Sequence, residues 1–128
     1  MARTALHSDG APKAIGPYSQ AIQVDGGKLT FCSGQIPLDP ATGQLVEGDI
    51  GVQAWRVMEN LSAVLAAAGL TFEHVVRSTI FLTDLGDFQK VNEVYGRCFQ
   101  GAPPARTTVQ VAALPRGARI EIDAIAVS

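Results

Sequence analysis

Apolar residues recur every three or four positions between residues 52 and 68, a spacing that predicts an amphipathic helix with one buried stripe. Asp49 stands where its side chain can cap the first turn of this helix, and Gly69 follows the last turn. A shorter stripe between residues 88 and 98 predicts a second helix, with Asp87 as its cap. The stripes are Val52, Trp55, Met58, Leu61, Leu65 and Ala68 in the first helix, and Phe88, Val91, Tyr95 and Cys98 in the second.

Segments rich in β-branched residues predict strands on either side of these helices. The first two strands flank the sequence Asp-Gly-Gly-Lys, and Asp-Gly or Gly-Gly at a tight turn predicts a β-hairpin. The stretch 34–45 holds two prolines and two glycines, so we expect a loop there. Pro103 and Pro104 prevent the second helix from continuing. The expected strands span residues 19–25, 28–33, 74–84, 105–112 and 118–127.

This order of elements predicts an α+β fold in which two helices pack on one face of a sheet. The other face then meets either water or another subunit. Along the last strand, one face carries Ile120, Ile122, Ala124 and Ala126, whereas Glu121, Asp123, Ile125 and Val127 share the opposite face. A face that mixes acidic and bulky apolar residues favours a subunit interface with a polar pocket.

The strand at residues 105–112 divides into two rows in the same way. Arg106 begins a polar row that continues through Thr108 and Gln110. We expect the other row to face the helices; it consists of Ala105, Thr107, Val109 and Val111. A guanidinium offers a fork of donors that binds a carboxylate through two hydrogen bonds, so Arg106 is a candidate anion ligand. The alternative is a surface arginine paired with a nearby acid such as Glu121.

Composition and charge limit the classes of function. The 128 residues suit one domain spanning residues 1–128, and apolar and charged contents of 47% and 17% are those of a folded globular chain. A net charge of -2 without a dense basic run argues against nucleic acid or an anionic membrane as the partner. The longest apolar run, residues 63–70, is too short to cross a bilayer, and the first ten residues lack the apolar core of a secretory signal.

The sequence contains few groups of the kind that bind metals or form nucleophiles. His7, His74, Cys32 and Cys98 are far apart, so we expect no zinc site. The two cysteines form no disulfide framework, which favours the cytoplasm, and they fall on expected buried elements. Neither a glycine-rich phosphate loop nor a G-x-S-x-G nucleophile elbow is present.

Four stretches together resemble the Rid family, also called YjgF-type reactive intermediate deaminases. The resemblance runs from about Ala11 to the C-terminus with the motifs in order, and it is closest to the RidA branch because Arg106 stands in the P-A-R motif. The stretches are APKAIGPYSQAI at residues 11–22, FCSGQIPLDPATGQL at 31–45, DFQKVNEVY at 87–95 and PPARTTVQVAALPRGARIEIDAIAV at 103–127.

The resemblance implies a chorismate-mutase-like fold, a mixed sheet of about six strands with two helices on one face, assembled as a homotrimer with clefts between subunits. It implies hydrolysis of 2-imino acids, such as 2-iminopropanoate and 2-iminobutanoate, and of their enamine tautomers, to 2-oxo acids and ammonia. These compounds escape from pyridoxal-phosphate dehydratases, so their removal protects other pyridoxal-phosphate enzymes. The resemblance implies no cofactor and no metal.

Carried onto this sequence, the resemblance makes Arg106 and Glu121 the catalytic residues. Arg106 would bind the substrate carboxylate, and Glu121 would orient or deprotonate the attacking water and later pass a proton to the departing ammonia. The other expected substrate-binding residues are Tyr18, Gly34, Phe88, Asn92 and Thr108, the last at a position where many family members have cysteine. The alternatives are an interface role for Glu121 and a helix-core role for Phe88.

Two other classes of function stay open at this point. The first is a non-enzymatic trimer that binds small carboxylates or acts as a chaperone-like partner protein. The second is a ribonuclease or translation inhibitor, a role ascribed to some relatives. The acidic charge balance and the lack of a basic stripe with interleaved aromatic residues disfavour the second class.

Overall fold

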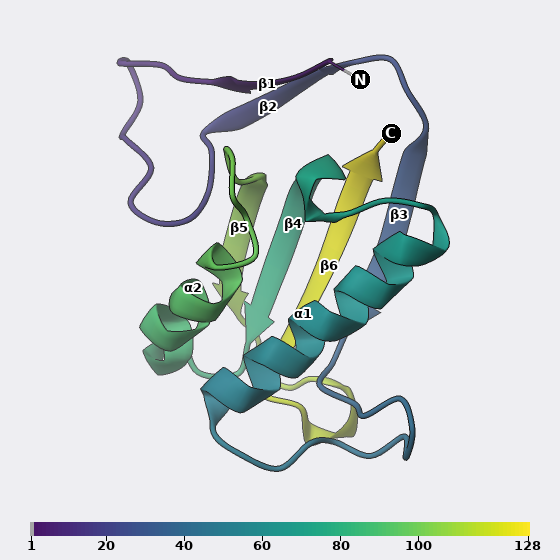
Figure 1. The fold of residues 1–128 in the computed structure, drawn as a ribbon. Helices are drawn as coiled ribbons and strands as arrows, with labels where there is room; N and C mark the ends of the chain where they lie inside the picture. The colour runs from purple at the N-terminus through teal and green to yellow at the C-terminus, as the bar shows by residue number, and fades with distance from the viewer. Residues whose placement is uncertain (1) are drawn as a thin grey trace.

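The fold has two layers, a four-stranded sheet and a pair of helices that cover one of its faces (Figure 1). The architecture comes from a computed structural model, which describes residues 2–128. The helices are α1, Ile50–Ala67, and α2, Phe88–Gly96. Three short 3₁₀ turns, Phe72–His74, Leu85–Asp87 and Pro115–Gly117, connect the larger elements.

The main sheet has the strand order β3-β6-β4-β5. All neighbours are antiparallel except β4 and β5, which run parallel because the chain between them crosses over through α2. The strands are β3, Leu29–Gln35; β4, Val75–Leu82; β5, Ala105–Gln110; and β6, Ile120–Val127. The two helices and six strands in mixed sheets confirm the predicted fold class, although the strands form two sheets rather than one.

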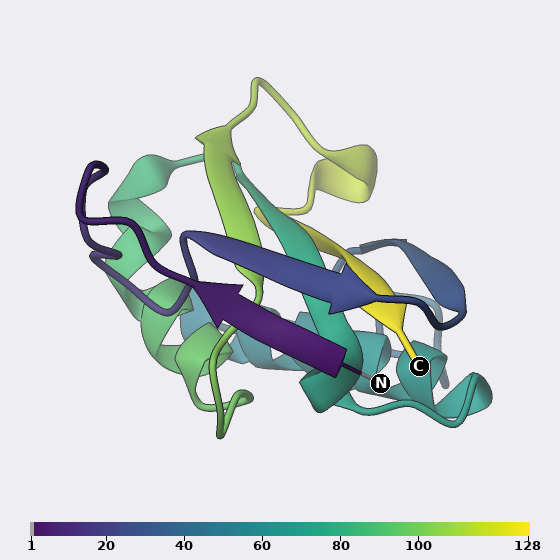
Figure 2. The same ribbon diagram turned by 90° about the horizontal axis from the view of Figure 1, so that it is seen from above.

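The second sheet is an antiparallel pair formed by β1, Ala2–Leu6, and β2, Ala21–Asp25. It lies across one end of the main sheet (Figures 1 and 2). The Arg3 side chain joins the two sheets by donating to the backbone carbonyl of Val75, with an Nη2–O distance of 3.0 Å. Strand β1 is not among the predicted strands, which begin at residue 19.

The predicted hairpin at residues 25–28 is wrong, because β2 pairs with β1 and β3 pairs with β6. Gly26 and Gly27 have φ angles of 80° and 98°, as expected for a sharp turn. However, a Cβ on Gly27 would collide with the carbonyl of Ser128, so the C-terminal end of β6 packs directly against this turn. β3 pairs with β6 along one edge only, so the hairpin fails because the turn carries the chain from one sheet to the other, where β2 pairs with β1.

Helix α1 begins and ends where the sequence predicts. The Asp49 side chain accepts a hydrogen bond from the Val52 backbone N–H at 3.0 Å, and Gly69 has a φ of 72° just beyond the last turn. The predicted stripe is wrong at three positions, because Val52 and Trp55 are each 48% exposed and Ala68 is exposed as well. The buried face consists of Ile50, Gly51, Ala54, Val57, Met58, Leu61 and Leu65. The first turns of this helix carry apolar residues on two sides. Only the side that begins with Ile50 and Ala54 continues at helical spacing to Leu61 and Leu65.

Helix α2 buries Val91, Val94 and Tyr95, whereas Phe88 is half-buried at its start. Asp87 stands at the N-cap position of α2, as predicted, but its side chain makes no capping bond and instead accepts from Arg119 at 3.0 and 3.2 Å. A 3₁₀ turn directly precedes the helix, so the helical segment begins earlier in the chain. Its cap is Asp84, whose side chain accepts from the Gly86 N–H at 2.8 Å.

The core lies between the helices and the covered face of the main sheet. Ile80, Leu82, Ile120 and Ile122 are at most 1% exposed. The opposite face is open and carries Phe31 at 71% exposure, so the alternation predicted for the last strand is confirmed for residues 120–126, whereas Val127 is buried at 1% exposure. Within residues 2–128, no helix combines the length and the hydrophobicity that crossing a membrane requires.

Replacement of Asp49 tests the cap of α1. Asp49→Ala leaves the Val52 N–H without its side-chain partner, so we expect a loss of about 0.5–2 kcal/mol in the free energy of unfolding. Urea denaturation at fixed protein concentration measures this loss. Glu47→Ala, an exposed neighbour outside the helix, serves as the control and should change the free energy by less than about 0.5 kcal/mol. Equal stability of the two variants would mean that the cap contributes nothing.

Candidate active site

Arg106 lies on edge strand β5 and points toward α2. In the parallel register it stands opposite Ser78 of β4, which is 2% exposed and faces the helices. The prediction that Ala105 and Thr107 face the helices is therefore wrong, because the polar row headed by Arg106 occupies that side. The reason is that α2 covers this edge with aromatic and polar side chains, which accommodate a guanidinium as purely aliphatic ones would not.

Three aromatic rings and one amide surround the Arg106 guanidinium. Its Cζ lies 5.3 Å from the ring centroid of Tyr18, 5.6 Å from that of Phe88 and 5.3 Å from that of Tyr95. Its Nη1 donates a hydrogen bond of 2.8 Å to the Asn92 side-chain oxygen. These contacts hold the cation at a half-buried position through cation–π attraction and one hydrogen bond.

The charge of Arg106 has no acidic partner within residues 2–128, where the ion pairs all involve other residues. The proposed surface pair with Glu121 is therefore not formed in the chain. Burial lowers the pKa of the Arg106 guanidinium from its ordinary value, while Tyr95 and Tyr18 act in the opposite direction. A partly buried cation without a counter-ion leaves electrostatic free energy to be gained by an anionic ligand.

A cavity of about 280 Å³ opens beside Arg106. Ile15, Tyr18 and Phe88 form its largely apolar walls, and Arg106 and Thr108 are its polar residues. The Thr108 Oγ1 is buried and has no hydrogen-bond partner within the described residues. A cation and an unsatisfied hydroxyl that share a small, mostly apolar space suit a small carboxylate with a short alkyl group.

The segment before β2 forms one wall of the cavity. The Tyr18 hydroxyl accepts a hydrogen bond from the Ile15 N–H at 3.3 Å, and the Ser19 N–H donates to the Pro104 carbonyl at 3.1 Å. This second bond ties the segment to the start of β5, directly before Arg106. Ile15 was missed as a cavity residue, although its position three residues before Tyr18 in the AIGPY stretch was a usable signal.

Glu121 and Gly34 lie together, but elsewhere. Glu121 stands opposite Phe81 in the sheet register, so it projects from the open face while Arg106 projects from the covered one. A Cβ on Gly34 would collide with the Glu121 carboxylate, which shows how closely this backbone approaches the acid. The structure thus brings together Tyr18, Phe88, Asn92, Arg106 and Thr108, and separates this cluster from Gly34 and Glu121.

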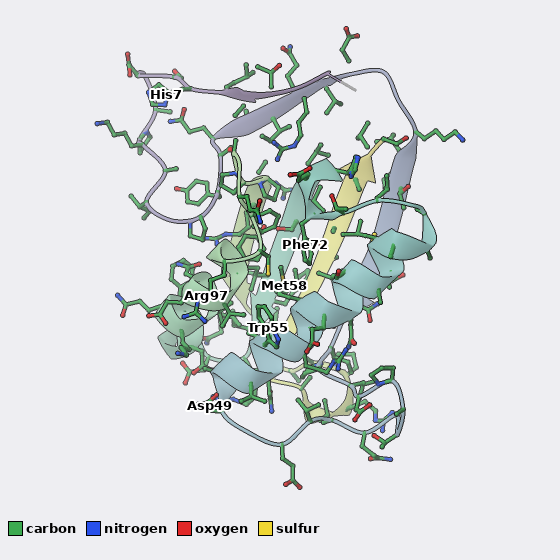
Figure 3. The ribbon with its side chains drawn as sticks, in the orientation of Figure 1. His7, Asp49, Trp55, Met58, Phe72 and Arg97 are labelled. Atoms are coloured by element: carbon green, nitrogen blue, oxygen red, sulfur yellow. The ribbon has the colours of Figure 1, made fainter. Side chains whose placement is uncertain are left out.

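A larger groove of about 560 Å³ runs between α1 and α2, with Trp55 and Arg97 at its sides (Figure 3). Two of its cations differ from Arg106 because acids accompany them: Arg56 lies 3.8 Å from Glu59, and Lys90 lies 3.4 Å from Glu93. The third, Arg97, forms no ion pair within residues 2–128, but it is exposed to water, whereas Arg106 is half-buried.

Neither cysteine lines the Arg106 cavity. Burial, with a smaller contribution from Asp123, raises the pKa of the Cys32 thiol. Burial raises the pKa of Cys98 to about 11, and its Sγ donates to the Val94 carbonyl at 3.7 Å. Within residues 2–128, no three His, Cys, Asp or Glu side chains are grouped in a way that would hold a metal ion.

Comparisons with known proteins agree on one family. The family model described as endoribonuclease L-PSP matches residues 8–128. The chain is 77% identical to protein DfrA of Myxococcus xanthus, over 100% of this chain and 98% of the relative. It is 52% identical to the mouse protein named 2-iminobutanoate/2-iminopropanoate deaminase, over 98% of this chain and 91% of that protein.

A solved structure of the same kind is that of Escherichia coli TdcF with bound serine. Its TM-score with this chain is 0.76 at 44% sequence identity, and the likeness covers 98% of each chain.

Replacement of Thr108 tests whether its hydroxyl is reserved for a ligand. Thr108→Val keeps the shape but removes a buried polar atom without a partner, so we expect the unliganded protein to gain about 1 kcal/mol in the free energy of unfolding. The matched control is Thr107→Val on the other face, where Thr107 Oγ1 accepts from Arg77 at 2.9 Å and nothing is gained. Urea denaturation compares the two, and a loss of stability in Thr108→Val would show that its hydroxyl is already satisfied.

Proposed function

The chain belongs to the endoribonuclease L-PSP family, also known as the YjgF/Rid family, and from this premise we propose that it hydrolyses 2-imino acids to 2-oxo acids and ammonia. The substrates are 2-iminopropanoate, 2-iminobutanoate and their enamine tautomers. The observation that carries the proposal is the half-buried Arg106 guanidinium, which faces a small cavity and has no acidic partner within residues 2–128. Curated mammalian relatives, at 46–52% identity, bear the name of this activity.

The cavity suits the substrate in three respects. Asn92 engages Nη1 of Arg106, so the Nε and Nη2 edge is left for two parallel hydrogen bonds to a carboxylate. Thr108 supplies a further hydroxyl for the polar end of the substrate. Tyr18, Phe88 and Ile15 provide apolar walls for a methyl or ethyl group. Serine bound to the relative from E. coli is likewise a small amino acid with a carboxylate.

The chemistry needs one acid–base group. Water adds to the C=N carbon of the protonated imine, and the proton that it loses goes to Glu121, which leaves a neutral carbinolamine. Glu121 returns this proton to the nitrogen and the C–N bond breaks. As the carbonyl forms, the hydroxyl proton passes to Glu121, which hands it to the departing ammonia to give ammonium. Charge is conserved throughout, and neither a cofactor nor a metal takes part. The Gly34 backbone, close to Glu121, would direct its carbonyl toward the nitrogen of the substrate.

Because Arg106 and Glu121 lie on opposite faces of one chain, the proposal requires that two subunits share each site. A homotrimer would bring the open face of one subunit against the Arg106 edge of the next, forming three equal clefts. The open face supports this arrangement, since Phe31 and Leu29 are 71% and 59% exposed there. We place this activity in the cytoplasm, where it would protect pyridoxal-phosphate enzymes from reactive imines.

Replacement of Arg106 tests the proposed carboxylate site. Two charge-assisted bonds of about 1.5–3 kcal/mol each correspond to a loss of about two to four orders of magnitude in kcat/KM for Arg106→Ala. Arg106→Lys keeps the charge without the fork and should recover only part of this loss. A threonine dehydratase generates the imine in the assay, and the rate of 2-oxobutanoate formation is measured. Arg97→Ala, an exposed arginine after α2, is the control.

Wild-type activity of Arg106→Ala would make this residue a surface charge. Loss of activity together with unfolding or dissociation, seen by circular dichroism and light scattering, would make it a structural residue instead.

Mixing of two inactive variants tests both Glu121 and the shared site. Glu121→Gln should bind pyruvate but lose turnover, because the amide cannot accept the proton. Co-expressed with Arg106→Ala, it should restore about one quarter of the wild-type rate, since each cleft draws two residues from randomly assorted subunits. Monomers in light scattering, or no recovery in mixed trimers, would contradict the shared site. Full turnover by Glu121→Gln alone would favour a different base, and pyruvate binding without any wild-type turnover would favour a carboxylate-binding protein.

A further inference from the structure

A pair of buried hydroxyl groups lies next to Arg106, on residues that do not line the cavity. Ser78 of β4 is 2% exposed and Tyr95 of α2 is 1% exposed. Their oxygens are 2.6 Å apart, a short hydrogen bond. Neither residue lines the cavity, so neither contacts a ligand bound there. The pair therefore serves some purpose other than binding.

Both residues are placed next to Arg106 by the fold. Ser78 is the register partner of Arg106 on the neighbouring strand, so the two side chains stand side by side. Tyr95 follows Asn92 by three positions on α2, so both point from the same side of this helix. Asn92 engages Nη1 of the guanidinium, while the Tyr95 ring lies 5.3 Å from its Cζ.

Filling of the core does not by itself explain this pair. Phenylalanine at position 95 and alanine at position 78 would bury the apolar surface without removing two hydroxyl groups from water. The hydrogen bond to Ser78 instead fixes the position of the hydroxyl end of the Tyr95 ring. Phe99 packs against the same ring, with centroids 4.7 Å apart at an interplanar angle of 50°. The ring is thus tethered by Ser78 and presents its surface to the guanidinium.

We propose that Tyr95, tethered by Ser78, is a positioning residue that supports the Arg106 guanidinium from the core side and directs its free edge into the cavity. The proposal rests on the proposed function, since it assigns a purpose to the same site. A guanidinium fixed before binding loses less conformational freedom when a carboxylate arrives, so the affinity is higher. Tyr95 itself remains a neutral phenol at physiological pH, because burial raises its pKa to about 12.

The test compares four variants of the full chain. Tyr95→Leu removes the supporting ring, Tyr95→Phe keeps the ring without the tether, and Ser78→Ala removes the tether alone. Phe99→Leu is the matched control, because it removes an aromatic ring from the same cluster but not one that contacts Arg106. Thermal denaturation measures the loss of stability in each variant. If Tyr95 had only a structural role, Tyr95→Leu would resemble the control Phe99→Leu.

The first readout is the rotation of the Arg106 guanidinium, followed by ¹⁵N NMR of its Nε and Nη resonances. We expect slow rotation in the wild type and in Phe99→Leu, and fast rotation in Tyr95→Leu. The second is the affinity for 2-oxobutanoate, by calorimetry, which should fall about 2- to 30-fold in Tyr95→Leu, the range of one cation–π contact. Tyr95→Phe and Ser78→Ala should lie between wild type and Tyr95→Leu. In the imine assay the loss should appear in KM rather than in kcat.

Equal rotation and equal affinity in Tyr95→Leu and Phe99→Leu would overturn the proposal. If Tyr95→Leu does not fold, Ser78→Ala decides, and wild-type behaviour of that variant in both readouts would overturn the tether. A wild type that neither binds 2-oxobutanoate nor hydrolyses imines would refute the proposed function, whereas the guanidinium rotation would still report on the positioning role.

Discussion

The structure around the candidate site depends on one constraint, a half-buried guanidinium without a carboxylate partner in the described part of its own chain. Such a cation is tolerated only where other groups compensate for lost hydration. Here the compensation comes from three regions far apart in sequence: Tyr18 before β2, Phe88, Asn92 and Tyr95 on α2, and β5 itself. The crossover through α2 and the bond from Ser19 to Pro104 are what bring these regions together.

Local patterns predicted those parts of the fold that local physics controls. The cap and end of α1 depend on Asp49 and Gly69, and the alternation of β6 depends on neighbouring residues, so both could be predicted. The hairpin at residues 25–28 failed because β2 pairs with β1, from the start of the chain, in a second sheet, a non-local pairing that the turn sequence does not signal. The face of β5 was misassigned because its polar row is covered by aromatic side chains of α2, a tertiary contact without a local signal.

Most residues of the Arg106 cavity could be predicted from the sequence, but Ile15 and the geometry could not. The resemblance to the Rid family supplied Arg106 and Glu121, and it took the structure to place them on opposite faces. The unsatisfied hydroxyl of Thr108 is invisible in sequence, because it reflects burial rather than residue type. Tyr95 was assigned to the buried stripe of its helix, which is correct, but its contact with a cation depends on the register of β5 against β4.

The raised pKa values of both thiols bear on how the protein withstands oxidants. Only a thiolate reacts readily with peroxides or alkylating agents, and Cys98, with a pKa of about 11, is almost entirely protonated at neutral pH. The cavity itself carries the alcohol of Thr108 where many Rid proteins carry a thiol. Hydroxyl and guanidinium groups do not undergo these oxidations, so oxidants of this kind would leave Thr108 and Arg106 unchanged.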